Sequence, residues 1–224
     1  MKNTNKLNLE NVTLVNVTDV RIEEGYRALK KSMEGINFKS VKLITSKNVV
    51  TNNKIIEIVK LENELTYDGY SKFIVYDLKD YIDTDYVLII QDDGFVANPS
   101  SWMNDFFNYD YIGAIWPKPD SNDKITYRDI FGNLQRVGNG GFSFRSKKLL
   151  EMPTELNLEW KQYYGFWNED GFLCCHNRHI LEENGIKYAP VDVAKYFSHE
   201  CEVEEIKGIT PFGFHGKNSK YYLK

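Results

Sequence analysis

The sequence predicts a single α/β domain with a mostly parallel central sheet and flanking helices. The chain has 224 residues, of which 42% are hydrophobic and 14% aromatic, enough to bury one full core. Strand and helix patterns alternate through the first half, which is typical of a wound α/β sheet. The run Tyr86–Ile90 is apolar without polar alternation, as in a strand that is covered on both faces.

Spacing and end signals define the individual elements. The segment 23–34 has acidic residues in its first turn and Gly35 after its end, which indicates a helix. The segment 70–81 carries apolar residues at helical spacing and leads into the strand at 86–90. Before residue 91 we therefore expect two helices, 23–34 and 70–81, and four strands, 12–17, 41–45, 55–59 and 86–90.

Composition excludes several classes of protein. A formal net charge of -4 and a pI near 5.7 give no general attraction to nucleic acid or to an anionic membrane. The apolar stretches are strand-sized and residues 1–10 are polar, so we expect no transmembrane segment, no signal peptide and a cytoplasmic protein. Cys174, Cys175 and Cys201 lack metal-site spacing and are expected to be reduced packing residues.

Two adjacent carboxylates, Asp92 and Asp93, follow the fourth strand. Ligands of parallel sheets bind at the carboxyl ends of strands, and carboxylates there suit a hard cation such as Mg2+ or Mn2+. Gly94 permits a sharp turn and leaves room for a ligand. Asp-Gly is also a common turn dipeptide, so plain turn chemistry is the alternative.

The second half is aromatic and glycine-rich and holds three more clusters. The segment 138–146 contains three glycines, which suit close approach of a flat ligand or, alternatively, a structural bulge. Glu169 and Asp170 precede an apolar segment, 172–180, that is expected to be helical; they suit either helix capping or a general base at a pocket rim. His215 lies between glycines, where it suits a closing segment that supplies a metal ligand.

In this order the clusters resemble those of GT-A nucleotide-sugar glycosyltransferases, most closely a largely uncharacterised family of short glycosyltransferase-like domains. The resemblance spans about residues 12–216, and its marks are the segments 91–95, 111–116, 138–142, 168–170 and 214–216. It implies a Rossmann-like sheet in one domain over 1–224, with a nucleotide-binding half at about 10–110, a sugar and acceptor half at about 111–216, and a tail at 217–224. The family's acidic pair normally reads Asp-x-Asp, whereas this chain has Asp92-Asp93-Gly94, so Asp93 is the safer ligand.

The resemblance implies transfer of a sugar from a nucleoside-diphosphate sugar to an acceptor hydroxyl, with inversion. A divalent cation, Mn2+ or Mg2+, would neutralise the departing diphosphate. Asp93 and His215 would hold it, with Asp92 as a further ligand or a ribose contact. Basic residues would contact the phosphates: Lys217, Lys220 and, as a weaker candidate, Lys72.

The remaining roles follow from the same resemblance. Thr18 and Asp19, after the first strand, would lie near the base and ribose. The donor-sugar and acceptor cleft would be lined by Gly140, Gly141 and Trp116. Asp170 would be the general base, with Glu169 as the alternate base or a partner of the acceptor. The acceptor would be a glycan, a lipid-linked glycan or a protein, and a lipid-linked one would bring the enzyme to a membrane surface.

Two other classes of protein share these features. A nucleotidyltransferase would also use an α/β sheet and strand-end carboxylates, but it would normally show a basic glycine-rich loop after the first strand, and residues 17–21 contain none. A non-catalytic carbohydrate-binding module on the same fold is favoured by the incomplete acidic motif and the short chain.

Overall fold

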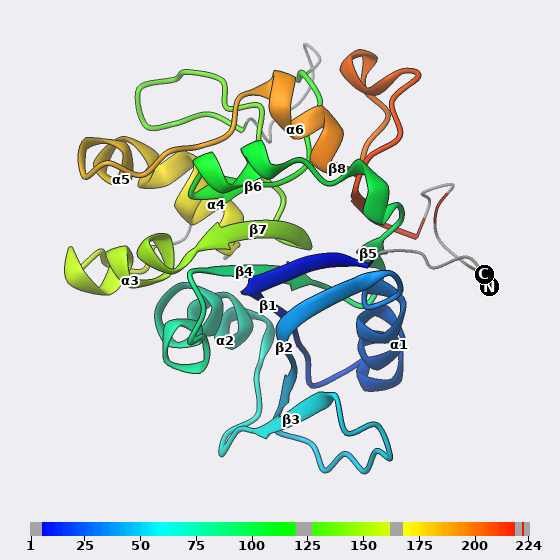
Figure 1. Cartoon of the computed structure of the whole chain (residues 1–224). Helices are drawn as coiled ribbons and strands as arrows, with labels where there is room; N and C mark the ends of the chain where they lie inside the picture. Colours follow the sequence, from blue (N-terminus) through cyan, green and yellow to red (C-terminus); the bar gives the residue numbers. More distant parts are fainter. Residues whose placement is uncertain (1–5, 120–126, 162–167, 218–220, 222–224) are drawn as a thin grey trace.

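A six-stranded sheet forms the centre of the molecule, in the order β3-β2-β1-β4-β7-β6 (Figure 1). The computed structural model describes residues 6–119, 127–161, 168–217 and 221. The first four strands of the chain are parallel, and β7 is antiparallel to both β4 and β6. The strands are β1 (Leu7–Val17), β2 (Ile36–Thr45), β3 (Ile56–Lys60), β4 (Tyr86–Ile90), β6 (Tyr111–Ile112) and β7 (Phe142–Ser146). The mostly parallel sheet and the four early strands are confirmed.

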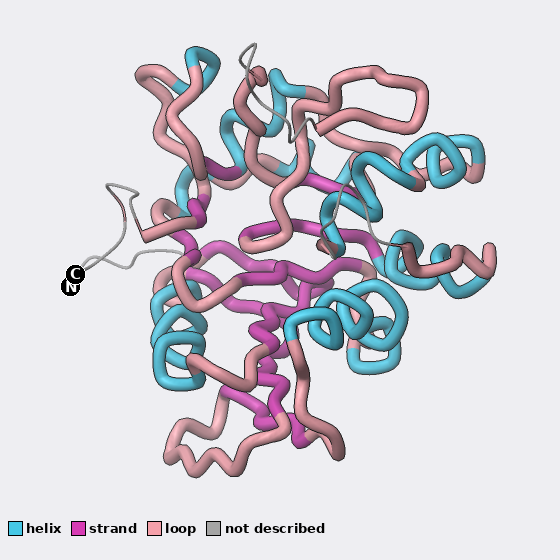
Figure 2. The backbone as a smooth tube through the Cα atoms, turned by 180° about the vertical axis from the view of Figure 1, so that it is seen from behind, coloured by secondary structure: helices cyan, strands magenta, loops and turns pink. Residues whose placement is uncertain are grey.

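Both faces of this sheet are covered, which explains the apolar run in β4. Alternate side chains point to opposite faces of a strand. Leu88 and Ile90 belong to the core that includes Ala28 and Leu29 of α1 (Ile22–Ser32). Val87 and Ile89 belong to a second core on the other face, which includes Phe73, Ile74 and Leu78. Figure 2 shows the strands running through the centre with helices on both sides.

The predicted helix at 70–81 is confirmed as one continuous helical segment. It begins as α2 (Tyr67–Lys72), where the Thr66 side chain caps the first turn by accepting from the Gly69 N–H. It continues through a π turn at Phe73–Asp77 and a 3₁₀ turn at Leu78–Tyr81. The segment 172–180 is also helical but is interrupted at Asn177, between a π turn at Phe172–His176 and α5 (Arg178–Glu183).

The other helical segments are short. They are α3 (Lys147–Glu155), α4 (Glu169–Gly171), α6 (Val191–Phe197), and the 3₁₀ turns Pro99–Ser101, Asn104–Asn108 and Glu204–Ile206.

A second, three-stranded sheet brings the C-terminal part of the chain to the end of β4. Its order is β5 (Gly94–Val96), β9 (Gly213–His215) and β8 (Ser198–His199). β9 is antiparallel to β5, and its register places His215 opposite Gly94. A Cβ on Gly94 would lie 2.9 Å from the Phe214 carbonyl oxygen, so glycine permits this close pairing. The histidine is therefore fixed beside the carboxylates that precede β5.

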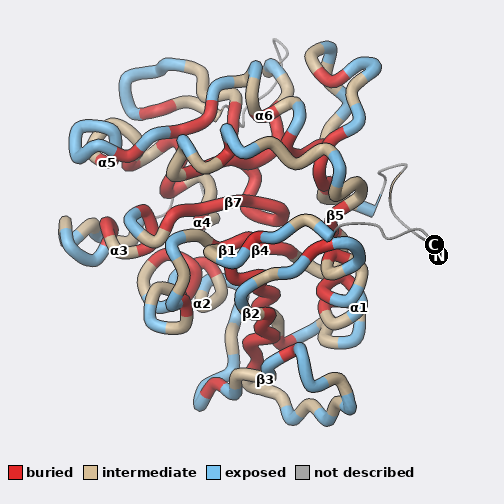
Figure 3. The backbone as a smooth tube through the Cα atoms, in the orientation of Figure 1, coloured by how far each residue is buried: buried red, intermediate tan, exposed pale blue. Residues whose placement is uncertain are grey.

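Burial is concentrated in the central strands, whereas the edge strand β3 is partly exposed (Figure 3). Cys174 and Cys175 are buried and unbridged, as expected of packing residues, and Cys201 is also a free thiol. Among the residues that the structure describes, no helix has the length and apolar character needed to span a bilayer.

Candidate active site

A cavity of about 470 Å³ lies at the carboxyl ends of β1 and β4. Between these two neighbours the strand order changes direction, because the chain passes from β1 to β2 and β3 on one side and then returns to β4 on the other. Such a topological switch point is where open parallel sheets bind their ligands. Thr18 and Gln91 come from the two strand ends. The other walls come from α2, through Tyr70, and from the glycine loop, residues 138–141, through Gly140 and Gly141. Glu169 and Asp170 of α4 and His215 of β9 complete the lining.

The two carboxylates after β4 have different partners. The Arg21 guanidinium lies 2.9 Å from Asp92 Oδ2, an ion-pair contact without hydrogen-bond geometry. Burial and the neighbouring charge of Asp93 raise the pKa of Asp92. Asp93 Oδ1 instead lies 3.1 Å from His215 Nε2. Burial acts to raise the pKa of Asp93, but the contact with His215 outweighs it and lowers that pKa, so Asp93 stays ionised.

His215 is held from both sides of its ring. Its Nε2 lies 3.1 Å from both Asp93 Oδ1 and Gln91 Oε1. Its Nδ1 lies 3.3 Å from Glu200 Oε1 and 3.2 Å from the Asn139 amide nitrogen. Burial acts to lower the pKa of His215, but Asp93 and Glu200 outweigh it and raise it to about 10. Among the described residues, no three His, Cys, Asp or Glu side chains gather into a complete metal cage.

The glycine loop makes room for functional side chains. A Cβ on Gly140 would lie 1.6 Å from Glu169 Oε1, and a Cβ on Gly141 would lie 2.2 Å from His215 Nε2. Asn139, with φ of 65°, stabilises the loop by accepting from the Gly141 N–H at 2.9 Å. The sequence suggested a bulge or a ligand surface here. Both glycines border the cavity, and they also let an acid and a histidine approach the backbone.

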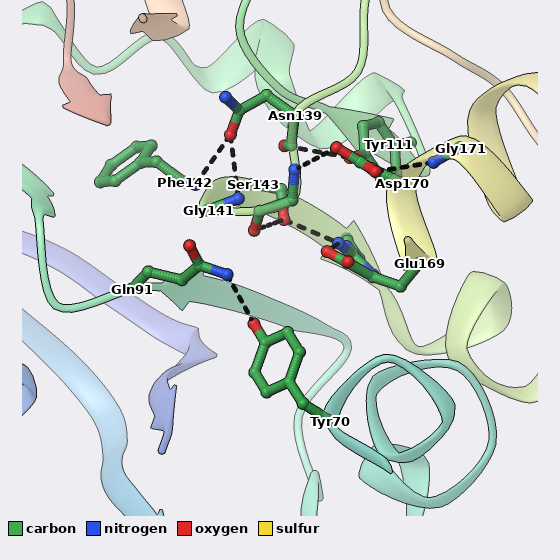
Figure 4. Close-up of polar contacts among 12 residues, drawn as sticks. Tyr70, Gln91, Tyr111, Asn139, Gly141, Phe142, Ser143, Glu169, Asp170 and Gly171 are labelled. Carbon is green, nitrogen blue, oxygen red and sulfur yellow. Dashed lines mark hydrogen bonds and ion pairs between the residues drawn. The ribbon is translucent and has the colours of Figure 1, made fainter. Parts of the chain in front are cut away.

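Glu169 and Asp170 reach this loop from α4 (Figure 4). Glu169 is buried and lies 3.2 Å from the guanidinium of Arg145, which is itself fully buried. Asp170 is half-buried; it accepts from the Gly140 N–H at 3.2 Å and from the Gly171 N–H at 2.7 Å. Burial and the adjacent charge of Glu169 raise the pKa of Asp170 to about 7. A carboxylate with such a pKa in a cavity suits proton transfer near neutral pH.

Asp19 borders the cavity but is an anchor rather than a free acceptor. Its Oδ1 accepts from the Thr45 hydroxyl at 2.8 Å and the Ser46 N–H at 2.6 Å. Its Oδ2 accepts from the Ser46 hydroxyl at 2.7 Å and the Leu65 N–H at 2.6 Å. These donors fill about four lone-pair sites, the capacity of a carboxylate. Asp19 therefore ties β1 to β2 and to the segment before α2, and its expected place near the base and ribose stays a prediction.

Other expected contacts fall outside the cavity lining. Trp116 is 3% exposed, packs over Gly138 and stacks on Tyr127 at 4.2 Å, so its expected place in the sugar cleft is wrong. Lys72 lies on the exposed side of α2 and does not border the cavity. Lys217 is exposed just after β9 and stays a prediction. Lys220 lies outside the described residues.

Several cavity residues were not singled out from the sequence. They are Tyr67, Tyr70, Gln91, Asn139, Asn168 and Glu200. Gln91 donates from its amide nitrogen to the Tyr70 hydroxyl at 3.1 Å, which joins the end of β4 to α2 (Figure 4). The sequence offers a reason to consider Gln91 and Asn139 as site residues, because each adjoins a motif residue. Glu200 carried none, since only the packing of β8 against β9 brings it to His215.

Comparison with solved structures supports the fold assignment. The galactosyltransferase LgtC in complex with donor and acceptor sugar analogues is 12% identical, with a TM-score of 0.53 over 91% of this chain and 86% of that one. An active-site mutant of LgtC gives 12% identity, a TM-score of 0.51 and the same coverage. A glycosyltransferase involved in glycosylation of the major capsid of PBCV-1 is 15% identical, with a TM-score of 0.47 over 94% of each chain. The likeness to LgtC shows a GT-A-like fold, as the sequence motifs predict.

Sequence comparison points to one family. No curated protein matches the chain. The family model described as "Protein of unknown function (DUF5672)" matches residues 56–215, which is well over half of the chain. The matched segment contains both acid pairs and the glycine loop, and it ends at His215. The cavity therefore lies largely within the segment that the family model matches, and the chain belongs to this family.

Proposed function

We propose that this protein transfers a sugar from a nucleoside-diphosphate sugar to an acceptor hydroxyl. The observation that carries the proposal is one cavity, at the switch point of the sheet, that is bordered by Asp92 and His215 at one side and by Asp170 at another, with an ionised Asp93 in contact with His215. The fold it shares with LgtC, which was solved with donor and acceptor sugar analogues, supports this reaction class.

The donor diphosphate would lie near Asp93 and His215. These side chains come from different elements and lie 3.1 Å apart at the end of β4. A carboxylate and an imidazole suit a divalent cation that also binds phosphate oxygens, because such ions keep few protein ligands. Asp93 and, once it has released a proton, His215 would therefore hold Mn2+ or Mg2+ as a partial site. When bound, the ion would neutralise charge on the departing diphosphate.

Asp170 would act on the acceptor. The Gly140 and Gly171 N–H groups fix its carboxylate at the cavity, so the group has a defined position. It would take the proton of the acceptor hydroxyl while that oxygen bonds to the anomeric carbon and the bond from this carbon to the diphosphate breaks. Attack from the side opposite the diphosphate gives inversion. Glu169 is committed to Arg145, so it is the weaker candidate for the base.

The test is a thermal-shift screen with UDP, GDP, CMP, dTDP and their sugars, each with Mn2+, Mg2+ or EDTA. A ligand that binds the folded protein raises its melting temperature by mass action. We expect one nucleotide to do so only with the metal, and the shift to disappear in Asp93→Ala. The control is Asp83→Ala, because Asp83 is 93% exposed and lies before β4, at the opposite end of the strand.

Two outcomes would contradict the proposal. If Asp93→Ala is unfolded without ligand, the carboxylate is a turn residue rather than a ligand contact. If the wild type gives no shift with any nucleotide but binds glycans, the protein is a carbohydrate-binding module.

A further inference from the structure

The first turn of α2 turns one of its faces to the cavity. Tyr67, Tyr70 and Ser71 all line it, and residues i, i+3 and i+4 share a face of a helix. Ser71 is buried, and the Tyr70 hydroxyl accepts from the Gln91 amide. Tyr67 differs from both, because it is 70% exposed although it borders the cavity. It therefore presents an accessible aromatic ring at the rim.

A hydrogen bond ties the Tyr67 ring to the wall that carries the expected base. The Tyr67 hydroxyl donates to Asn168 Oδ1 at 3.2 Å, and Asn168 directly precedes Glu169 and Asp170. Burial and the negative charges of Glu169 and Asp170 raise the pKa of Tyr67, because both acids act on its hydroxyl. The ring is thus restricted to a position near the carboxylate that would receive the acceptor proton.

An aromatic ring in this position suits the flat face of a sugar. The face of an aromatic ring carries partial negative charge and attracts the C–H groups of a pyranose. Ligand sites combine such aromatic surface with a few polar groups that fix orientation. A single exposed tyrosine is ordinary on a protein surface, but Tyr67 also lines the cavity and is bonded to its opposite wall. A serine or threonine of a protein acceptor offers no comparable flat apolar face.

The charges around the cavity favour an acceptor sugar without a negative charge. Among the described residues that line it, none is lysine or arginine, and five are acidic: Asp19, Asp92, Glu169, Asp170 and Glu200. Like charges repel at short range, so a uronic or sialic acid beside Glu169 and Asp170 would be disfavoured. A neutral pyranose avoids this repulsion, and its hydroxyl groups can donate to the carboxylates.

We infer that the Tyr67 ring packs against the face of a neutral pyranose in the acceptor, and that the acceptor is therefore a glycan. The inference rests on the proposed function, because it places this sugar beside Asp170, which would take a proton from one of its hydroxyl groups. Tyr67 then determines acceptor specificity and leaves nucleotide binding at Asp93 and His215 unchanged.

The test is a saturation-transfer NMR titration of the full chain with methyl glycosides of glucose, galactose and mannose and with methyl glucuronide. Each is added alone and together with any nucleotide and Mn2+ that give a thermal shift. We expect the wild type to bind at least one neutral glycoside, and to bind methyl glucuronide more weakly. In Tyr67→Ala the affinity for that neutral glycoside should fall roughly tenfold, because the stacking surface is lost.

Three further variants separate the ring from the hydroxyl and from exposed tyrosines in general. Tyr67→Phe keeps the ring, so its affinity should stay within about threefold of the wild type. Tyr67→Trp enlarges the ring and should bind at least as tightly, and it supplies the comparison if Tyr67→Ala is unfolded. Tyr196→Ala is the matched control, because Tyr196 is 39% exposed on α6 and lies outside the cavity lining.

The inference is overturned if Tyr67→Ala binds the glycoside like the wild type, if methyl glucuronide binds best, or if Tyr67→Ala loses the nucleotide shift, which would make Tyr67 a donor contact. A metal-dependent nucleotide shift without binding of any neutral glycoside would refute this inference and leave the proposed function standing. Glycoside binding that depends on Tyr67, without any nucleotide shift, would refute the proposed function and leave a carbohydrate-binding surface at Tyr67.

Discussion

Two adjacent acid pairs lie at the same cavity: Asp92, Glu169 and Asp170 border it, and Asp93 contacts His215 in its wall. Their surroundings give the pairs different chemistry. In each pair the first acid lies against an arginine: Asp92 is 2.9 Å from Arg21, and Glu169 is 3.2 Å from Arg145. The second acid differs. Asp93 contacts His215, and its pKa is lowered, whereas Asp170 accepts from the backbone N–H groups of Gly140 and Gly171 and lies beside Glu169, and its pKa is raised to about 7.

The comparison shows that an acid pair in a sequence does not define a role. Carboxylates whose environments separate their pKa values take different parts in catalysis. Asp93 keeps its charge near neutral pH and suits a cation site. Asp170 exchanges its proton near neutral pH and suits a general base. The difference comes from His215, a positively charged side chain that the pairing of β5 with β9 brings against Asp93, whereas Asp170 lies beside the negative Glu169.

The largest effect should come from Asp170→Asn. Removal of a general base lowers kcat by about 10²- to 10⁴-fold. Donor binding, followed by thermal shift, should remain, because Asp93 and His215 are intact. In the wild type, kcat should rise with pH around 7, since the base acts only when ionised. If Asp170→Asn loses donor binding as severely as Asp93→Ala does, the two acid pairs do not have separate roles.

Breaking the buried ion pair should cost stability. The side chains of Arg145 and Glu169 are 0% and 7% exposed. In Arg145→Met the Glu169 carboxylate is left buried without its cation, and the free energy of unfolding should fall by about 3–5 kcal/mol. The double variant Arg145→Met/Glu169→Gln should recover much of that loss in urea unfolding. If the double variant recovers no stability, Arg145 stabilises the protein through its packing against Tyr111 rather than through its charge.

The raised pKa of Asp170 should also appear in stability. The folded protein holds this proton up to pH about 7, whereas the unfolded chain releases it near pH about 4. The stabilisation is therefore present below pH about 4 and is lost as the pH rises toward 7. Relative to the wild type, Asp170→Asn should melt higher at pH 8 than at pH 4. Parallel melting curves at all pH values would show that Asp170 has an ordinary pKa.

The smallest effect is expected at the other arginine. The side chains of Arg21 and Asp92 are 34% and 21% exposed, so solvent screens their attraction. Arg21→Gln should change the free energy of unfolding by only about 0–1 kcal/mol. Urea unfolding of Arg21→Gln and of Arg145→Met, measured under the same conditions, checks this difference in the free energy of unfolding. A loss as large as that of Arg145→Met would make the two arginines equivalent.

The sequence predicts the fold well because local signals and tertiary structure agree. The apolar run of β4 reflects two covered faces, and the first helix has its acids and terminal glycine where expected. The four motif clusters also meet at one cavity, although their individual contacts are less predictable. Asp19 borders the cavity, but its carboxylate accepts hydrogen bonds from β2 and from Leu65. Trp116 packs over Gly138, outside the cavity lining.

Residues that depend on long-range pairing are the ones that the sequence cannot indicate. Glu200 reaches His215 through β8 and β9, and nothing in its neighbours marks it. The direction of Gln91 depends on the turn that follows β4, in which the Gly94 N–H donates to the Gln91 carbonyl, and on a hydrogen bond to Tyr70. Two adjacent acids are a clearer sequence signal than an amide beside them, yet Gln91 Oε1 lies as close to His215 Nε2 as Asp93 Oδ1 does, at 3.1 Å.

The pairing of β5 with β9 has a consequence for how the protein is made. The carboxylates at the end of β4 leave the ribosome more than a hundred residues before His215. A nascent chain can form the parallel sheet early, but its ligand site exists only after the last strand has docked. The donor should therefore bind only after β9 has docked, and bound donor should protect β9 from proteolysis in the folded protein.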